Sequence, residues 1–247
     1  MSEWFERDSF WETFEDFMFD QRRVDLTRGE VDRMIDLMHL APDAKVLDLC
    51  CGIGRHSVEF ARRGYAVTGV DRTNSYLQRA REAAIKQGVA VEFVESDMRK
   101  FSRPNTFDGA VNFFTAFGYF DDPADDRATA ANVYASLRDG GRFILHMNGK
   151  ENLARKFRER DWHRRDDGRI LLEERRLLDG WSRIETHWIL LDADTRRELS
   201  FTLRIYSGAE LAALLRGVGF RSVELYGTLA GAPYDHAAER LIAVSTK

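Results

Sequence analysis

Residues 46–57 read Val46-Leu47-Asp48-Leu49-Cys50-Cys51-Gly52-Ile53-Gly54-Arg55-His56-Ser57. An apolar segment enters a turn of small residues, which then continues with the spacing of a helix. Glycines in such a turn let the backbone approach a ligand closely, and the helix that follows presents free amides. The pattern predicts a strand, a ligand-binding loop and a helix.

The apolar pattern on both sides of this loop alternates between short and long segments. Short apolar runs predict strands at 45–49, 66–70, 91–95, 107–112 and 142–147. Helical spacing lies between them at 54–63, 74–87 and 123–137. Alternation of this kind predicts an α/β fold, with a doubly wound parallel sheet covered on both faces.

The segments outside this alternation have different patterns. Residues 9–18 and 29–40 predict N-terminal helices, and the aromatic residues of the first suit either a helix packed on the sheet or a lid over a pocket. Strand-like alternation after residue 150 predicts an antiparallel insertion of about three strands, at 169–178, 181–192 and 197–206. A helix at 209–216 and strands at 222–226 and 240–245 follow. The charge run 155–167 suits either an anion-binding patch for an acidic acceptor or, because its acids nearly cancel its bases, a solvated helix face, which we favour.

We therefore expect one domain spanning residues 1–247. Its parts would be a helical lid (1–40), a cofactor-binding core (41–150), an antiparallel cap (151–206) and a segment that completes the sheet (207–247). If the lid closes the pocket, deletion of Met1–Phe19 should weaken turnover of the substrate.

Acidic residues follow successive predicted strands. Asp71 can accept hydrogen bonds from both hydroxyls of a ribose, and Asp97 ends the third strand. A dinucleotide site would have glycine where Ser57 stands. Asp48, at the end of the first strand, suits an ammonium group better than a pyrophosphate. An NAD-type oxidoreductase and a non-catalytic binding protein remain alternatives.

With these residues the sequence resembles the class I S-adenosylmethionine-dependent methyltransferases, over about 45–147 and 204–246. The resemblance implies that the glycine-rich loop, Asp71 and Asp97 bind the methionyl tail, the ribose and the adenine amino group. Cys50 stands where the common pattern has its first glycine, and the loop is similar to that of a bacterial small-molecule subgroup with the sequence CCGxGRHS. The predicted S-adenosyl-L-methionine contacts are Asp48, Cys50, Cys51, Gly52, Gly54, Asp71, Arg72, Asp97, Met98 and Asn112.

The methyl acceptor should lie beyond the carboxyl ends of the strands, beside 112–119 and 146–149. Methyl transfer from a sulfonium is an in-line displacement, so positioning is the main task. A base is needed only for an acceptor that holds its proton. His146 is a candidate base or an imidazole hydrogen-bonded at a strand end. The candidate catalytic residues are His146, Tyr119, Tyr234 and His236.

The composition of the chain bears on which binding partners to expect. With 37 Lys+Arg and 41 Asp+Glu the net charge is −4, which gives no general attraction to nucleic acid, and the base-gripping strings N-P-P-Y and D-P-P-Y are absent from the sequence. We expect N- or O-methylation of a small molecule, no nucleic-acid partner and no metal, in a monomer or homodimer. Adjacent Cys50 and Cys51, an acidic start and no apolar run of about 20 residues favour a cytoplasmic protein without membrane attachment.

Overall fold

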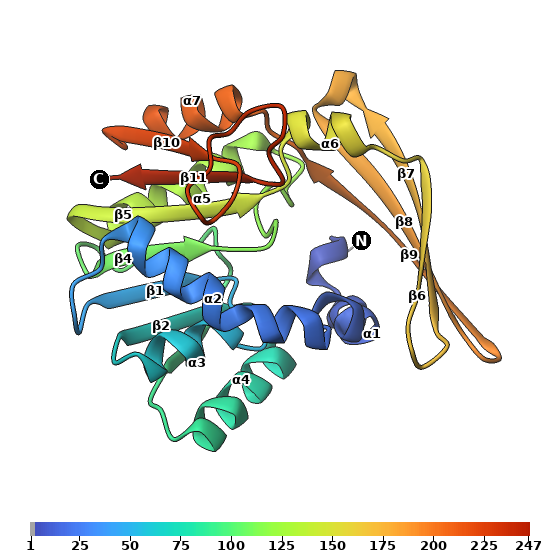
Figure 1. Cartoon of the computed structure of the whole chain (residues 1–247), viewed down its shortest axis with the longest axis horizontal. Coiled ribbons are helices and arrows are strands. Elements are labelled where there is room, and N and C mark those ends of the chain that lie inside the picture. The colour runs from blue at the N-terminus through green and yellow to red at the C-terminus, as the bar shows by residue number, and fades with distance from the viewer. Residues whose placement is uncertain (1–2) are drawn as a thin grey trace.

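The computed structural model describes residues 3–247, and its core is a seven-stranded sheet (Figure 1). The strand order is β10-β11-β5-β4-β1-β2-β3. Strands β1 to β5 pair in parallel, whereas β11 is antiparallel to both β5 and β10. The strands are Lys45–Leu49 (β1), Ala66–Asp71 (β2), Glu92–Glu95 (β3), Phe107–Asn112 (β4), Leu137–Met147 (β5), Ser222–Tyr226 (β10) and Leu241–Thr246 (β11). The expected α/β fold is confirmed.

Helices cover both faces of this sheet because side chains alternate along each strand. Val46 packs in one apolar cluster with residues of α2 and α3, and the next residue, Leu47, packs in another with residues of α5 and α7. This alternation gives the sheet two buried faces. The helices are Gln21–Met38 (α2), Arg55–Arg62 (α3), Asn74–Gln87 (α4), Pro123–Ser136 (α5) and Gly208–Val218 (α7).

Helix α2 begins eight residues earlier than the predicted start at residue 29. Asp20 caps it, because its carboxylate accepts a hydrogen bond from the backbone amide of Arg23 at 2.9 Å. Gly29, which looked like a helix start, lies inside the helix with no atom near the place a Cβ would occupy. The capping residue Asp20 therefore marks the start of this helix better than the glycine does.

The insertion forms a second, antiparallel sheet of four strands, β6-β7-β8-β9, rather than about three. After α6 (Lys150–Lys156), the strand β6 (Arg160–Arg164) occupies the middle of the charge run 155–167, where a helix was predicted, so the helix prediction was wrong beyond residue 156. β6 has no apolar alternation and is held by pairing with β7, including the Arg160–Glu174 ion pair at 3.2 Å. The other strands are Ile170–Leu178 (β7), Arg183–Asp192 (β8) and Thr195–Arg204 (β9).

The N-terminal segment lies between the two sheets (Figure 1). It consists of a short 3-10 helix, Trp4–Glu6 (η1), and of α1 (Asp8–Met18). Phe10 and Phe14 are buried against apolar side chains of β7, β8 and β9. Trp11 and Met18, on another face of α1, line a pocket, so the lid stays a prediction with a helix in the right place for it. Deletion of Met1–Phe19, of which residues 1–2 lie outside the described residues, would also expose the inner face of the cap.

A buried acid joins the cap to the core. Asp126 in α5 accepts a 2.7 Å hydrogen bond from the hydroxyl of Tyr206, which follows β9, and Arg204 Nε lies 3.4 Å from the same carboxylate. Burial raises the pKa of Asp126 to about 6, although the Tyr206 bond and the Arg204 charge act in the opposite direction.

Stability should therefore depend on pH through Asp126. A carboxyl pKa that is raised by folding contributes stability below about pH 4, and this contribution is lost as the pH rises through about 6. The full shift corresponds to about 2–3 kcal/mol. In urea unfolding between pH 4 and 7.5, Asp126→Asn should lose less stability than the wild type. The exposed control Asp139→Asn should follow the wild type, and parallel curves for Asp126→Asn and wild type would contradict the assignment.

Candidate active site

The loop after β1 has a left-handed backbone at three positions. The φ angles are 62° at Cys50, 55° at Gly52 and 74° at Gly54, and Gly54 is the N-cap residue of α3. At Gly54 a Cβ would lie 2.7 Å from the Cβ of Ala80 in α4, so only glycine fits there. A left-handed non-glycine residue costs about 1–2 kcal/mol. Cys50 bears this cost, which explains why glycine suits its position.

Asp71 ends β2 and holds the loop from the neighbouring strand. Its carboxylate accepts hydrogen bonds from the backbone amides of Gly52 at 2.8 Å and Thr73 at 2.9 Å. Burial raises the pKa of Asp71, and these two bonds oppose the rise. Because a carboxylate has about four acceptor positions, two remain for a ligand.

Asp97 follows β3 and is fixed by Arg99. The Arg99 guanidinium donates to both Asp97 oxygens, with distances down to 2.6 Å, and also to Asp125 at 3.1 Å. Burial alone would raise the pKa of Asp97, but the Arg99 bonds lower it below its ordinary value. The carboxylate is therefore ionised and fixed in orientation.

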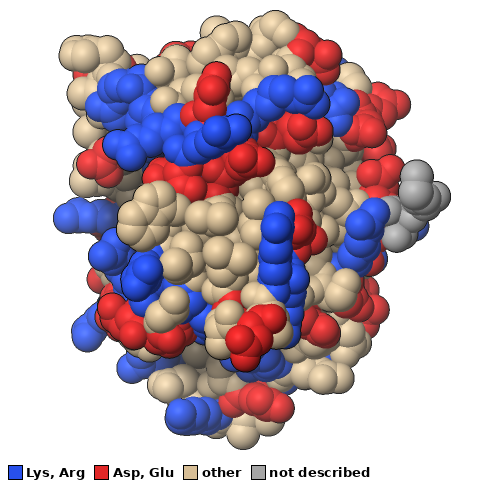
Figure 2. All heavy atoms as spheres, turned by 90° about the vertical axis from the view of Figure 1, so that its right-hand side faces the viewer, with Lys and Arg blue, Asp and Glu red and all other residues tan. Residues whose placement is uncertain are grey.

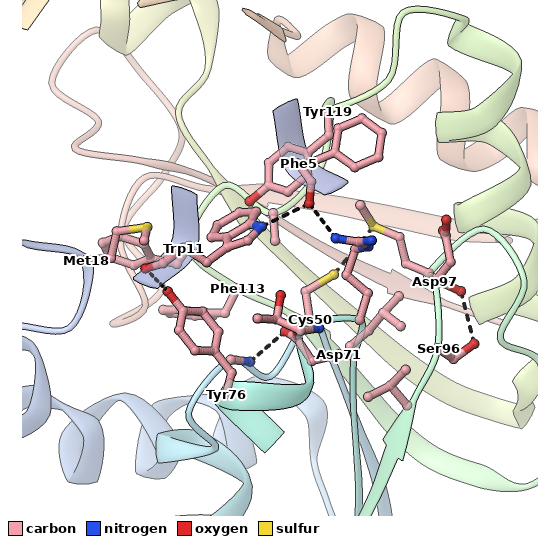
Figure 3. Close-up of a pocket in the computed structure, with 18 of the residues that line it drawn as sticks. Phe5, Trp11, Met18, Cys50, Asp71, Tyr76, Ser96, Asp97, Phe113 and Tyr119 are labelled. Atoms are coloured by element: carbon pink, nitrogen blue, oxygen red, sulfur yellow. Dashed lines mark hydrogen bonds between the residues drawn. The ribbon is translucent and has the colours of Figure 1, made fainter. Parts of the chain in front are cut away.

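One pocket joins these acids to the N-terminal segment (Figure 3). It contains about 830 Å³ of space free of atoms, a figure that includes the open solvent at its mouth. Cys50 and Asp71 lie on one side, Ser96 and Asp97 on another, and aromatic side chains opposite them. Carboxylates and an apolar wall together suit a ligand with a ring and hydroxyl groups. The aromatic and apolar lining includes Phe5, Trp11, Phe19, Phe113 and Tyr119.

The N-terminal part of this lining is fastened by hydrogen bonds to core residues. Arg72 donates to the carbonyl of Phe5 at 2.8 Å, and the hydroxyl of Tyr76 donates to the carbonyl of Trp11 at 2.7 Å. The ring of Phe19 covers Gly52, where a Cβ would lie 2.8 Å from it. These contacts give the lid a defined position over the pocket.

The predicted cofactor residues fall into two groups. Cys50, Gly52, Asp71, Arg72, Asp97 and Met98 line the pocket, whereas Asp48, Cys51, Gly54 and Asn112 do not. Asp48 is 2% exposed and accepts a 2.6 Å hydrogen bond from the hydroxyl of Ser57. Its position therefore favours a support for the loop over a direct contact with an ammonium group. Asn112 is fully buried at the end of β4, and its Oδ1 has no hydrogen-bond partner among residues 3–247.

His146 lies outside the pocket lining, stacked on Phe113 with ring centres 4.0 Å apart. Burial, followed by the charge of Arg240, lowers the pKa of His146 to about 3, so the ring is neutral at pH 7. Its Nδ1 accepts from the backbone amide of Phe114 at 3.3 Å, which leaves the proton on Nε2. Without a free lone pair the ring cannot act as a base here. Of the two readings, this geometry favours the hydrogen-bonded imidazole.

The other candidate catalytic residues differ in whether they line the pocket. Tyr119 lines the pocket, with its ring centre 4.9 Å from that of Trp4. Tyr234 and His236 are not among the lining residues, and the Tyr234 hydroxyl donates to Glu151 at 2.7 Å. Only Tyr119 is therefore placed to touch a ligand.

Several lining residues were not predicted from the sequence. Tyr76, Thr73 and Ser96 reach the pocket from the start of α4 and the end of β3, and Phe19 reaches it from the link between α1 and α2. Thr73 and Ser96 lie next to predicted acids, which was a usable signal. No sequence signal marks Tyr76, because its spacing in α4 is that of a core residue.

The chain is similar in sequence to known methyltransferases over part of its length. Residues 46–141 match the family described as "Methyltransferase domain". A putative methyltransferase of Geobacillus is 27% identical over 115 residues, 47% of each chain. The 23S rRNA (uracil(1939)-C(5))-methyltransferase RlmD of Alkalilimnicola ehrlichii is 36% identical over 81 residues, 32% of this chain and 18% of that protein. The chain thus spans half or less of the length of these relatives.

Solved structures share the architecture over almost the whole chain. An S-adenosylmethionine-dependent methyltransferase from Clostridium acetobutylicum has a TM-score of 0.78 at 15% identity, covering 97% of this chain and 98% of its own. An amino pentose methyltransferase of Micromonospora echinaspora, solved with S-adenosylmethionine bound, has a TM-score of 0.67 at 24% identity, covering 97% of both chains. At these identities the likeness shows a shared fold, and the methyltransferase domain model matches the part of this fold that contains the glycine-rich loop, Asp71 and Asp97.

Proposed function

We propose that the protein transfers a methyl group from S-adenosylmethionine to a small-molecule acceptor, at nitrogen or oxygen. The observation that carries the proposal is the pocket itself. It lies where the strand order reverses between β1 and β4, and it combines Asp71, Asp97 and a wall of aromatic rings. Ligands of open α/β sheets bind at this switch point.

The residues present fit this cofactor. Asp71 has free acceptor positions for the ribose hydroxyls, and Asp97 is ionised and oriented toward the pocket for the adenine amino group. When bound, S-adenosylmethionine supplies an activated methyl group on a sulfonium. The Cys50 thiol is no competing nucleophile, because burial and the nearby acids raise its pKa well above the ordinary value.

The chain's contribution to transfer is positioning and exclusion of water. Phe113, Phe114 and Tyr119 line the pocket after β4 and would orient the acceptor, and Trp11 would cover it. Orientation of two reactants can supply roughly 7–11 kcal/mol of the barrier. A base from the chain is not required for an amine acceptor that arrives unprotonated.

A small acceptor is favoured over nucleic acid by two observations. The match to the rRNA methyltransferase covers 18% of that protein, so it concerns a shared domain and not a shared acceptor site. Figure 2 shows the face formed by the cap sheet, where basic and acidic side chains of the described residues are intermixed.

Among residues 3–247, no helix is both long and apolar enough to cross a bilayer.

The proposal is tested by transfer of a labelled methyl group. Purified full-length protein is incubated with methyl-labelled S-adenosylmethionine and a low-molecular-mass metabolite extract. Mass spectrometry should show a labelled product, heavier than its precursor by one labelled methyl in place of hydrogen, and an equal amount of S-adenosylhomocysteine. Asp71→Ala should form much less of both. Donor binding without any transfer would favour a non-catalytic binding protein.

A further inference from the structure

Three arginine guanidinium groups lie close to two aromatic rings that line the pocket. The Cζ atom of Arg23 lies 4.2 Å from the ring centre of Phe114, and that of Arg240 lies 5.9 Å from the same centre. The Cζ atom of Arg55 lies 6.0 Å from the ring centre of Phe113. Because both rings line the pocket, these cations border the place expected for the acceptor.

The charges in this cluster do not balance. Arg55 forms an ion pair with Glu30 and is thereby neutralised. The guanidinium groups of Arg23 and Arg240 form no ion pair within 4.0 Å among residues 3–247; that of Arg23 donates to the carbonyls of Phe17 and Met18, and that of Arg240 donates to Asn148 Oδ1. Two guanidinium groups with uncharged partners therefore face one aromatic ring.

Partial burial makes this excess charge costly. Burial lowers the pKa of Arg240, and burial together with the Arg240 and Arg55 charges lowers the pKa of Arg23 although Asp20 and Glu30 act in the opposite direction. The neighbouring His146 is neutral and contributes no charge. Half-buried guanidinium groups that form no direct ion pair are stabilised by a bound anion, although Asp20, Glu30 and Glu239 act on them at longer range.

The backbone beside the cluster is held in a costly conformation. Phe114 and Thr115 have φ angles of 70° and 62°, and both amides are fixed by His146, through its Nδ1 at 3.3 Å and its carbonyl at 3.0 Å. Strain of this kind, held by surrounding contacts, is typical of ligand-binding segments. The conformation places the Phe114 ring in the pocket lining and close to both arginines.

We propose that Arg23 and Arg240 form the subsite for an anionic group, a carboxylate or a phosphate, carried by the methyl acceptor. This inference rests on the proposed function and defines the acceptor as an acidic small molecule. Guanidinium groups suit such oxyanions because they donate parallel N–H bonds to two oxygens. The free donor positions of Arg23 and Arg240 would bind the anion, and the rest of the acceptor would extend along Phe114 into the pocket.

The subsite is tested first by anion titration. Inorganic phosphate and succinate are titrated calorimetrically into the wild type and three variants at low ionic strength. At least one probe should bind the wild type, more than tenfold more weakly to Arg240→Met, with part of the affinity kept in Arg240→Lys. The control Arg142→Met removes another half-buried arginine, which donates a hydrogen bond to the carbonyl of Leu37, and this variant should bind the probes like the wild type. Equal affinity in Arg240→Met, or no binding to the wild type, would overturn the proposal.

The source of the anion is tested on the methylated product. The labelled product should be retained by an anion-exchange resin. Phosphatase treatment of the extract beforehand should abolish its formation if the group is a phosphate and leave it if the group is a carboxylate. A product without anionic charge overturns the subsite while leaving the methyltransferase proposal intact. Conversely, failure of the wild type to bind S-adenosylmethionine overturns the proposed function, and the anion titration still decides the subsite.

Discussion

Asp71→Ala is expected to weaken S-adenosylmethionine binding by about 2–4 kcal/mol, a factor of roughly 30–1,000 in affinity. The substitution removes the expected acceptor of the ribose hydroxyls. It also removes the 2.8 Å bond to the amide of Gly52 that holds the glycine-rich loop. Calorimetric titration of the donor measures both effects together.

A carboxylate on the neighbouring strand provides the control. Glu95 ends β3, is exposed, bonds to Asn74 and does not line the pocket. Glu95→Ala should bind the donor like the wild type. If Asp71→Ala bound as tightly as Glu95→Ala, Asp71 would have no part in cofactor binding, and the proposed orientation of the cofactor would be wrong.

Gly118→Ala should lower the free energy of unfolding by about 2–4 kcal/mol. Gly118 has a φ of 94°, and a Cβ there would lie 2.4 Å from the carbonyl oxygen of Arg204. The amide of Arg204 also donates to the Gly118 carbonyl at 2.7 Å, so this contact joins the loop after β4 to the end of β9. Urea unfolding measures this loss of stability. Titration with the donor should show a lower affinity, because Tyr119 and Phe120, which line the pocket, directly follow Gly118.

Strain and steric clash are separated by a second glycine. Gly88, at the end of α4, has a φ of 66° but no atom within 4 Å of its Cβ position. Gly88→Ala should therefore cost only the left-handed backbone term, about 1 kcal/mol. Equal losses of unfolding free energy in Gly118→Ala and Gly88→Ala would show that the close approach of Gly118 to the Arg204 carbonyl adds nothing to the cost of the left-handed backbone.

The core fold could be predicted because its signals are local. The runs at β1, β2 and β4 are apolar, and the glycine-rich loop follows β1 directly. β6 could not be found in this way. Its residues lack alternation, and its structure depends on pairing with β7, a contact between separate segments that composition does not encode.

The candidate site was predictable only in part, for a similar reason. Acids at strand ends follow from spacing, so Asp71 and Asp97 were expected in the pocket where they lie. Asp48 occupies a strand end too, but its hydrogen bond to Ser57 depends on the path of α3. The meeting of Arg23 with Arg240 depends on how α2 and the last loop approach Phe114, and no spacing in the sequence indicates it.

The most direct test of the central claim is equilibrium dialysis of the purified, monodisperse full-length protein against labelled S-adenosylmethionine. The account predicts uptake of one donor molecule per chain, displaced by S-adenosylhomocysteine and unaffected by NAD. Absence of uptake, or displacement of the donor by NAD, would contradict it.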